Sequence, residues 1–512
     1  MIIIGSKALE VSDFNRIVYH GEKVRLDLSA LEKSQNSYDY LREFSKKSII
    51  YGVNTGLGPM AQYRISPEEQ EQLQYNLIRS HSSGAGAMLP LHCIKALMIA
   101  RISSLMQGYS GIHQEMLVLM SEFINNDIYP EIPEHGGVGA SGDLVQLAHL
   151  ALSLIGEGNA WYKGTVRPVA EILKELGLAP ARIHMREGLA IMNGTSAMTG
   201  IGICNLLLAR KLVNWSLIAS AMINELVESY DDHFSSELNR VKKHAGQQTI
   251  ASAMRTVLDS SRLIRKRSEH LYHKEITEDF FVDKVQEYYS LRCIPQILGP
   301  VLDTLNVSER VLEDEVNSAN DNPIIDVAGS NIFHGGNFHG DYISLEMDKM
   351  KVAVTKLSML AERQINFLMN KNLNGKFPPF LNLGKLGFNF GMQGVQFTAT
   401  STVAENQSLC FPNYVHSIPN NNDNQDIVSM GTNSALIARK VILNTYQVLA
   451  IEFMSIMQAV RYVNQPERMA PETRGIFERF QEVFPVFVED AVKSQDIKKV
   501  ENYLLENTPE LV

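Results

Sequence analysis

The stretch Gly136-Gly-Val-Gly-Ala-Ser-Gly-Asp-Leu-Val-Gln-Leu-Ala-His149 decides the fold of this chain, because it places a glycine-rich loop directly before an apolar segment. Its first part, Gly137 to Gly142, matches the G-x-G-x-x-G pattern of dinucleotide-binding loops. Such a loop must follow a buried β-strand. Here Pro130-Glu-Ile-Pro-Glu-His135 comes before it, and a segment with two prolines cannot be a central strand. The pattern therefore does not indicate a nucleotide site.

The tripeptide Ala140-Ser141-Gly142 inside this stretch suggests a different chemistry. Glycine tolerates unusual dihedral angles and alanine adds little bulk, so the amide nitrogen of Gly142 can approach the carbonyl carbon of Ala140. Ring closure with loss of water, and dehydration of Ser141, would leave an exocyclic methylene conjugated to an imidazolone. No ordinary side chain offers such an electrophile. The tripeptide is common, however, and most occurrences are ordinary turns, so its context must decide.

The composition limits the class of protein. The chain has 512 residues, more than one compact core usually holds. Lys and Arg number 47 against 57 Asp and Glu, and the net charge of -10 disfavours nucleic acid or an anionic membrane as a partner. The four cysteines contain no C-x-x-C pair, which fits reduced thiols in a cytoplasmic protein. The N-terminus lacks the basic region of an export signal, so we expect a cytoplasmic protein.

Residues Gly188 to Ala209 carry no charge and could be mistaken for a membrane span. They include Asn193, Thr195 and Ser196 as well as several glycines, which makes the segment too polar for a convincing span. We expect it to be buried within the protein.

The chain changes character near residue 195. Before it, short turns alternate with helical patches, and two short strands are expected near the N-terminus and near Trp161 to Val169. After it, helical periodicity extends over long segments: Met198–Val227, Pro300–Glu315, Asp341–Met369, Gly391–Leu409 and Asn433–Tyr462. Pro300 suits the first position of its helix.

These patterns predict a mainly α protein. Its expected parts are an N-terminal domain over residues 1–195, a central helical bundle over 196–465 and peripheral C-terminal helices over 466–512. Helices this long, several with little charge, favour a bundle shared with other subunits.

Gly136 to His149 closely resembles the signature of the histidine, phenylalanine and tyrosine ammonia-lyases, which build the methylidene-imidazolone (MIO) group at Ala-Ser-Gly. Five further blocks follow in the family's order: Tyr51-Gly-Val-Asn-Thr-Gly, Glu187-Gly-Leu-Ala-Ile-Met-Asn-Gly-Thr195, Tyr289-Ser-Leu-Arg292, Gly335-Gly-Asn-Phe-His339 and Asn424-Gln-Asp-Ile-Val-Ser. The resemblance implies the fumarase/aspartase-like architecture of these lyases, with an N-terminal MIO-bearing region and a long central bundle. It also implies a homotetramer in which each active site draws on three subunits.

The resemblance assigns roles to individual residues. MIO would form from Ala140, Ser141 and Gly142, and the amine of a small amino acid would add to its methylene and become a better leaving group. Tyr51 matches the family's base; tyrosine ordinarily ionises near pH ~10, so its site would have to favour the phenolate. Asn193 matches an asparagine near the MIO carbonyl.

Further positions match the family's active site. Arg292 matches the arginine that holds the substrate carboxylate through a bidentate fork, while Tyr289, Phe338 and Gln425 match other site positions. Two of these residues have a structural alternative: an ion pair for Arg292 and simple core packing for Phe338. Two departures, Val145-Gln146 and Glu287-Tyr288, point away from the standard histidine branch.

Four histidines, at 135, 149, 334 and 339, raise the question of a metal. They show no H-E-x-x-H or comparable spacing, and the chemistry above needs no metal or nucleotide. We interpret them as structural or surface residues.

The substrate is set in this family largely by a residue pair that is Ser80-His81 here. Ser-His is usual in histidine enzymes, and Glu405 lies where those enzymes carry an acidic residue. The body of the chain, however, most resembles bacterial tyrosine ammonia-lyases of the flexirubin and aryl-polyene type, for example over Gln74–Gly84 and Ile418–Ile427. In such a pocket His81 could hydrogen-bond a phenol, and phenylalanine would leave a buried polar group unpaired.

The predicted reaction is therefore conversion of L-tyrosine to 4-coumarate and ammonia, with L-histidine to urocanate as the alternative. An aminomutase would use the same group and return ammonia to the β-carbon, which the sequence leaves open. A binding protein on the same fold would be expected to lack the Ala-Ser-Gly triad, Tyr51 or Arg292, and all are present.

Overall fold

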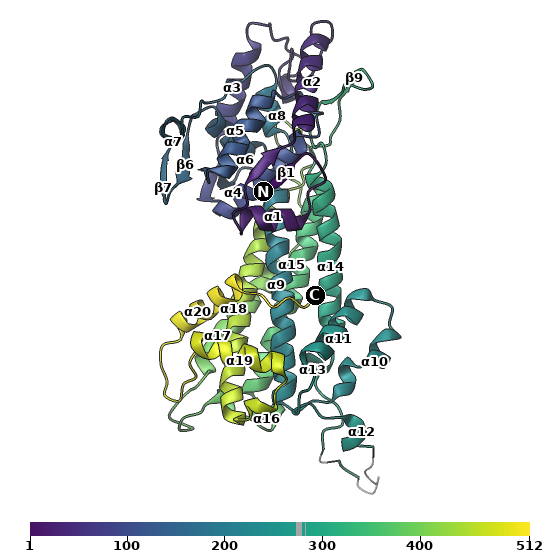
Figure 1. Ribbon diagram of the computed structural model, residues 1–512, viewed down its shortest axis with the longest axis vertical. Helices are drawn as coiled ribbons and strands as arrows, with labels where there is room; N and C mark the ends of the chain where they lie inside the picture. Colours follow the sequence, from purple (N-terminus) through teal and green to yellow (C-terminus); the bar gives the residue numbers. More distant parts are fainter. Residues whose placement is uncertain (273–278, 282) are drawn as a thin grey trace. The chain divides into compact units, whose positions relative to one another are not determined.

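The computed structural model describes residues 1–272, 279–281 and 283–512 and shows a protein built mainly of α-helices (Figure 1). The predicted fold class is confirmed. The strands are few, two to four residues long, and form only small sheets.

The chain groups into two compact units. Unit 1 contains Met1–Leu207, Ser308–Asp348 and Pro412–Ala438, and unit 2 contains Leu208–Val307, Lys349–Phe411 and Arg439–Val512. Four helices have residues in both units: α9 (Ser196–Leu226), α14 (Ile294–Val316), α15 (Asp341–Met369) and α18 (Gly431–Val463). The division of the linear sequence at residues 195 and 465 stays a prediction.

Unit 1 holds the shorter elements of the N-terminal half. Its helices are α1 (Val11–Val18), α2 (Leu28–Phe44), η1 (Gly58–Met60), α3 (Gln70–His81), α4 (Leu91–Leu105), α5 (Gln114–Asn125), α6 (Leu144–Leu154), α7 (Val169–Leu176) and α8 (Glu187–Met192). Its strands are β1 (Ile2–Ile4), β2 (Val24–Leu26), β3 (Ala85–Met88), β4 (Tyr129–Pro130), β5 (Pro133–His135), β6 (Asn159–Tyr162), β7 (Thr165–Pro168), β8 (Ile324–Asp326) and β9 (Asn331–Phe333).

These strands pair locally. β1 and β2 are parallel, β3 pairs with β5, β8 with β9, and β4, β6 and β7 form a three-stranded antiparallel sheet. The strands expected near the N-terminus and near residues 161–169 are therefore present. Almost every side chain of α4 is buried, so this helix lies in the core of unit 1.

Unit 2 holds the remaining helices: η2 (Asp231–Phe234), α10 (Ser236–Arg240), α11 (Ala245–Val257), α12 (Arg267–His270), α13 (Tyr289–Arg292), α16 (Lys371–Asn374), η3 (Pro379–Leu381), α17 (Gln393–Leu409), η4 (Pro466–Arg468), α19 (Pro471–Val483) and α20 (Ser494–Glu506). Trp215 packs edge-on against Phe453 and Phe480, whose rings stack 4.7 Å apart. The C-terminal helices are thus anchored to the unit by an aromatic cluster.

The predicted long helices agree with the structure to within a few residues, except at Pro300. Helix α14 begins at Ile294, so Pro300 lies inside it and the prediction that it opens the helix is wrong. The missing N–H removes one hydrogen bond, but the helix continues through it. The preceding turn packs closely at Gly299, where an added Cβ would lie 2.7 Å from the Gln247 nitrogen.

The periodic face of α15 is confirmed by its burial. Ile343, Met347, Met350, Val354, Leu357 and Leu360 are all at least 96% buried. Spacings of three and four place these side chains on one stripe of the helix, which supplies its packing energy.

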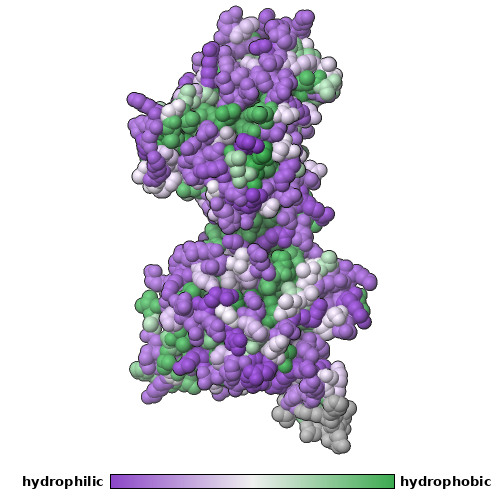
Figure 2. Space-filling view, in the orientation of Figure 1, coloured by the Kyte–Doolittle hydropathy of each residue, from purple (hydrophilic) through white to green (hydrophobic). Residues whose placement is uncertain are grey.

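Helix α9 is long and apolar enough to cross a membrane by composition, but 83% of its most apolar window is buried within the protein. The interpretation of this region as a buried element is confirmed. On the face shown in Figure 2, polar residues cover most of the surface, with hydrophobic areas between them.

Candidate active site

A cavity of about 1190 Å³ in unit 1 brings together eight of the twelve predicted site residues. They are Tyr51, Ser80, His81, Ala140, Ser141, Asn193, Phe338 and Gln425. These residues come from six separate parts of the sequence, and most lie on turns at helix ends. The cavity also has apolar walls, to which Leu77, Leu144 and Leu189 contribute.

The third position of the Ala-Ser-Gly loop has no room for a side chain. Gly142 has φ +70, and a Cβ there would overlap the carbonyl oxygen of Gly194. A parallel bridge pairs Gly142 with Gly194, and the Asp143 amide donates to the Gly194 carbonyl over 2.8 Å. The tripeptide is thus a bent segment fixed against a second glycine turn.

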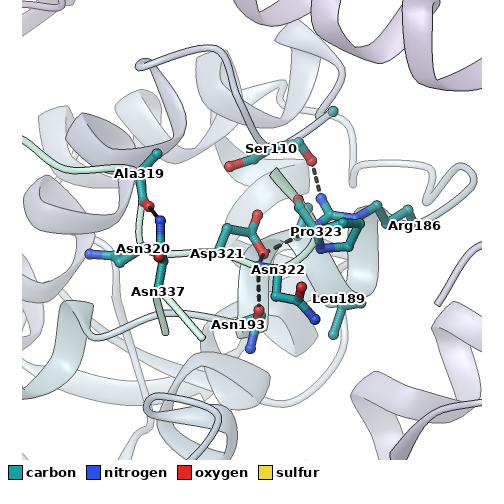
Figure 3. A network of polar contacts seen from close by, with 12 residues as sticks. Ser110, Arg186, Leu189, Asn193, Ala319, Asn320, Asp321, Asn322, Pro323 and Asn337 are labelled. Atoms are coloured by element: carbon teal, nitrogen blue, oxygen red, sulfur yellow. Dashed lines mark hydrogen bonds and ion pairs between the residues drawn. The ribbon is translucent and has the colours of Figure 1, made fainter. Parts of the chain in front are cut away.

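Asn193 reaches the centre of this loop. Its Nδ2 donates to the Ser141 carbonyl oxygen over 3.1 Å, and its Oδ1 accepts the Asn322 amide over 2.9 Å. Figure 3 shows the Asn193–Asn322 contact. Because Asn322 N–H can only donate, it fixes the orientation of the Asn193 amide and directs the NH₂ group to Ser141.

Gln425 contacts the other polar atom of Ser141. Its Nε2 donates to the Ser141 hydroxyl over 2.7 Å. An MIO ring would retain the Ser141 carbonyl and lose the hydroxyl as water. Asn193 would therefore still donate to the Ser141 carbonyl after the ring has formed. Gln425 donates to the hydroxyl oxygen that would leave as water, and so would assist its departure. These residues fit the group.

Asp143 ties the loop to two helices. Its Oδ2 accepts the amides of Ala197 and Met198 at the start of α9, over 2.8 and 2.9 Å, and its Oδ1 accepts the Thr432 hydroxyl over 2.5 Å. Burial raises the pKa of Asp143 to about 6, although these three hydrogen bonds lower it. The carboxylate at a helix N-terminus is favoured by the helix dipole.

Tyr51 lies in the turn before η1. Its hydroxyl accepts the Gly58 amide over 2.9 Å, and its own amide donates to Nε2 of His334. A backbone N–H thus holds the Tyr51 hydroxyl in place at the cavity.

Ser80 and His81 close the last turn of α3. His81 Nδ1 lies 3.0 Å from the Leu77 carbonyl and 2.9 Å from the Ser80 hydroxyl. A carbonyl oxygen only accepts, so Nδ1 carries the proton and Nε2 is an acceptor. Burial lowers the pKa of His81 below its ordinary value, which favours this neutral form.

Four predicted residues do not line the cavity: Gly142, which directly follows Ser141 in the loop, and three residues of unit 2. Tyr289, Arg292 and Glu405 belong to unit 2. Tyr289 is 70% exposed, and Arg292 lies over its ring at 4.6 Å from the centroid. The Arg292 Nε donates to the Glu287 carbonyl, and no described residue accepts from its two Nη atoms. Glu405 accepts from Asn444 and lies 3.6 Å from Lys440.

The sequence did not single out Asn322 or Asp143. Asp143 directly follows the tripeptide, and this position could have marked it as a residue of the site. Asn322 stands in Asn320-Asp-Asn-Pro323, a turn-forming run, but only the fold brings it to Asn193.

The histidines do not gather. His149 accepts the Gly84 amide, His334 accepts the Tyr51 amide, and His339 lies 3.4 Å from Asp341. Within the described ranges, no three His, Cys, Asp or Glu side chains are arranged to hold a metal ion.

Comparison with known proteins gives a consistent result. The profile of the aromatic amino acid lyase family matches residues 9–482. A tyrosine 2,3-aminomutase of Myxococcus sp. (strain Mx-B0) is 39% identical over 94% of this chain and 93% of its own. A histidine ammonia-lyase of Geobacillus sp. (strain WCH70) is 36% identical over 98% and 96%. The crystal structure of a tyrosine aminomutase from Streptomyces globisporus superposes with a TM-score of 0.95, at 35% identity, covering 99% of this chain and 97% of the other.

Fold and relatives together define an enzyme of the ammonia-lyase and aminomutase class. The chain belongs to the aromatic amino acid lyase family.

Proposed function

We propose that this enzyme converts L-tyrosine to 4-coumarate and ammonia, using an MIO group formed from Ala140, Ser141 and Gly142. The observation that carries the proposal is the pair of donors on Ser141, one from Asn193 to its carbonyl and one from Gln425 to its hydroxyl. When formed, the group supplies an electrophilic methylene for the substrate amine. It needs no metal or nucleotide.

The side chains of the cavity would do the remaining work. Tyr51 would take the β-proton, with its oxygen stabilised by the Gly58 amide. Asn193 would stabilise negative charge on the ring carbonyl. Phe338 and the apolar walls would hold the aromatic ring and exclude water.

His81 supports tyrosine as substrate. Its neutral imidazole presents Nε2 as an acceptor at the cavity, and a phenol hydroxyl is a donor of matching chemistry. Phenylalanine would leave Nε2 desolvated without a partner. The likeness to tyrosine 2,3-aminomutases supports the same substrate.

We also propose a cytoplasmic homotetramer whose partner subunits complete each site. Tyr289, Arg292 and Glu405 lie in unit 2 and do not line the cavity. Ligand cavities usually measure about 300–1,000 Å³, so a cavity of about 1190 Å³ has room for a small amino acid and for side chains from elsewhere. The free Nη atoms of Arg292 suit a substrate carboxylate.

The experiment is incubation of the purified enzyme with tyrosine, histidine or phenylalanine, with products identified by absorbance and mass. 4-Coumarate as the dominant product is expected. Urocanate as the dominant product would refute the substrate and make Glu405 the partner of an imidazolium. A native mass of one chain with full activity would refute the shared site.

A second candidate is a tyrosine 2,3-aminomutase, favoured by the 39% identity to enzymes of that name. It would return the ammonia to the β-carbon of the same intermediate acid. Chiral chromatography of the tyrosine reaction distinguishes the two, because β-tyrosine accumulates only with the aminomutase.

A further inference from the structure

Behind the Ala-Ser-Gly loop lies a buried cation with no role in the reaction described so far. Arg101, on α4, is fully buried within unit 1. Its Nη2 donates to the carbonyls of Ala190 and Asn193 over 2.5 and 2.9 Å. Its Nη1 donates to Asn320 Oδ1 over 3.1 Å. All three acceptors are neutral groups, so the Arg101 guanidinium forms no hydrogen bond to a carboxylate. Burying a guanidinium in this way is unfavourable.

The Arg101 guanidinium packs closely against the turn that contains Asn193 and Gly194. A Cβ on Gly194 would overlap Arg101 Nη1 and lie 2.6 Å from Asn320 Oδ1. Gly194 is therefore enclosed between Arg101 on one side and the tripeptide on the other, where it is bridged to Gly142. Moving Arg101 would release the turn on which the tripeptide is bent.

The charge of Arg101 also acts on the peptide group that joins Asn193 to Gly194. Arg101 donates to the Asn193 carbonyl, which polarises the amide of the same peptide, the N–H of Gly194. In a parallel bridge of this register, that N–H faces the Ser141 carbonyl. The Ser141 carbonyl also receives Asn193 Nδ2. The Asn193 side chain and the Gly194 backbone, which both lie against the tripeptide, thus belong to a segment that Arg101 fixes.

We propose that Arg101 is a positioning residue for ring closure. It holds Asn193 and Gly194 against the tripeptide, so that the Gly142 nitrogen and the Ala140 carbonyl carbon stay close enough to react. The new bond is C–N, and the carbonyl oxygen of Ala140 leaves as water; the Ser141 hydroxyl leaves as a second water. The proposal rests on the proposed function, since it assumes that the ring forms.

The test is Arg101→Lys, which keeps the charge but replaces the two Nη atoms of the planar fork by one ammonium nitrogen, so the donors no longer reach out from two separate atoms. The matched control is Arg186→Lys. Arg186 is also fully buried, and donates to Ser110, Asp321 and Pro323, but not to residues 190–194 (Figure 3).

The readout is the intact mass of the purified chain, which falls by two water molecules when the ring forms. For Arg101→Lys we expect at least a tenfold smaller fraction of ring-containing chain, with kcat reduced in proportion and KM for tyrosine unchanged. Arg186→Lys should mature fully at a comparable melting temperature. Full maturation of Arg101→Lys, or equal loss in Arg186→Lys, overturns the proposal.

A second variant covers a failure of Arg101→Lys to fold. Asn320→Ala removes the acceptor of Nη1, which it shares with the Ser104 hydroxyl, and leaves both acceptors of Nη2 in place. We expect ring formation in a time course after synthesis to slow severalfold. An unchanged time course refutes the positioning role. If wild-type chain shows no loss of two waters, the proposed MIO itself fails, which is a distinct result.

Discussion

Replacement of His81 by phenylalanine tests how the cavity recognises the aromatic ring of its substrate. In the wild-type protein, Leu77 fixes the Nδ1 proton, so that Nε2 can only accept. A tyrosine hydroxyl pairs with this acceptor, whereas phenylalanine leaves it desolvated. An unsatisfied buried polar group costs about 1–3 kcal/mol, which corresponds to roughly 5- to 150-fold in kcat/KM.

His81→Phe removes the acceptor and should remove this discrimination. We expect kcat/KM for tyrosine to fall and that for phenylalanine to rise, shifting their ratio by at least about tenfold. The assay is initial rates of 4-coumarate and cinnamate formation, with intact mass confirming an unchanged ring content. His81→Gln, which can still accept through its amide oxygen, is the matched control and should retain part of the preference. A tyrosine-to-phenylalanine ratio within twofold of wild type would show that His81 does not read the ring.

Three further predictions concern the ring, its donor and pH. Ser141→Ala should abolish the two-water mass loss and nearly all activity; an active variant would sink the mechanism. Asn193→Asp keeps the acceptor for the Asn322 amide but loses the donor to Ser141, so kcat should fall about 10²–10³-fold; a change in KM alone would contradict this role. Burial raises the pKa of Glu187 to about 7. The folded state then holds a proton that the unfolded state releases, and stability should fall as pH rises from 4.5 to 7. The melting temperature of the wild type should fall relative to that of Glu187→Gln as pH rises across this window, because only the wild type carries the titrating group. A constant difference between the two melting temperatures would show that Glu187 does not titrate there.

Much of the fold could be predicted because it depends on local periodicity. The stripe of apolar residues on α15 fixed both the limits and the buried face of that helix. The prediction at Pro300 was wrong because the preference of proline for the start of a helix is only a local tendency. In the structure α14 continues through Pro300, and the preceding residue, Gly299, is closely packed against Gln247.

The tripeptide and its neighbouring blocks could be recognised in the sequence, and the resemblance that they carry indicated the family and eight of the residues that line the cavity. Residue types and spacing carry that information, since only small residues permit the bend at Gly142. Tertiary structure alone decided which groups meet. It brings Asn322 to Asn193, Gln425 to Ser141 and Arg101 beneath Gly194, across separations of more than ninety residues. Such contacts arise from the packing of distant helices around buried polar groups that must all be satisfied, and no local pattern encodes them.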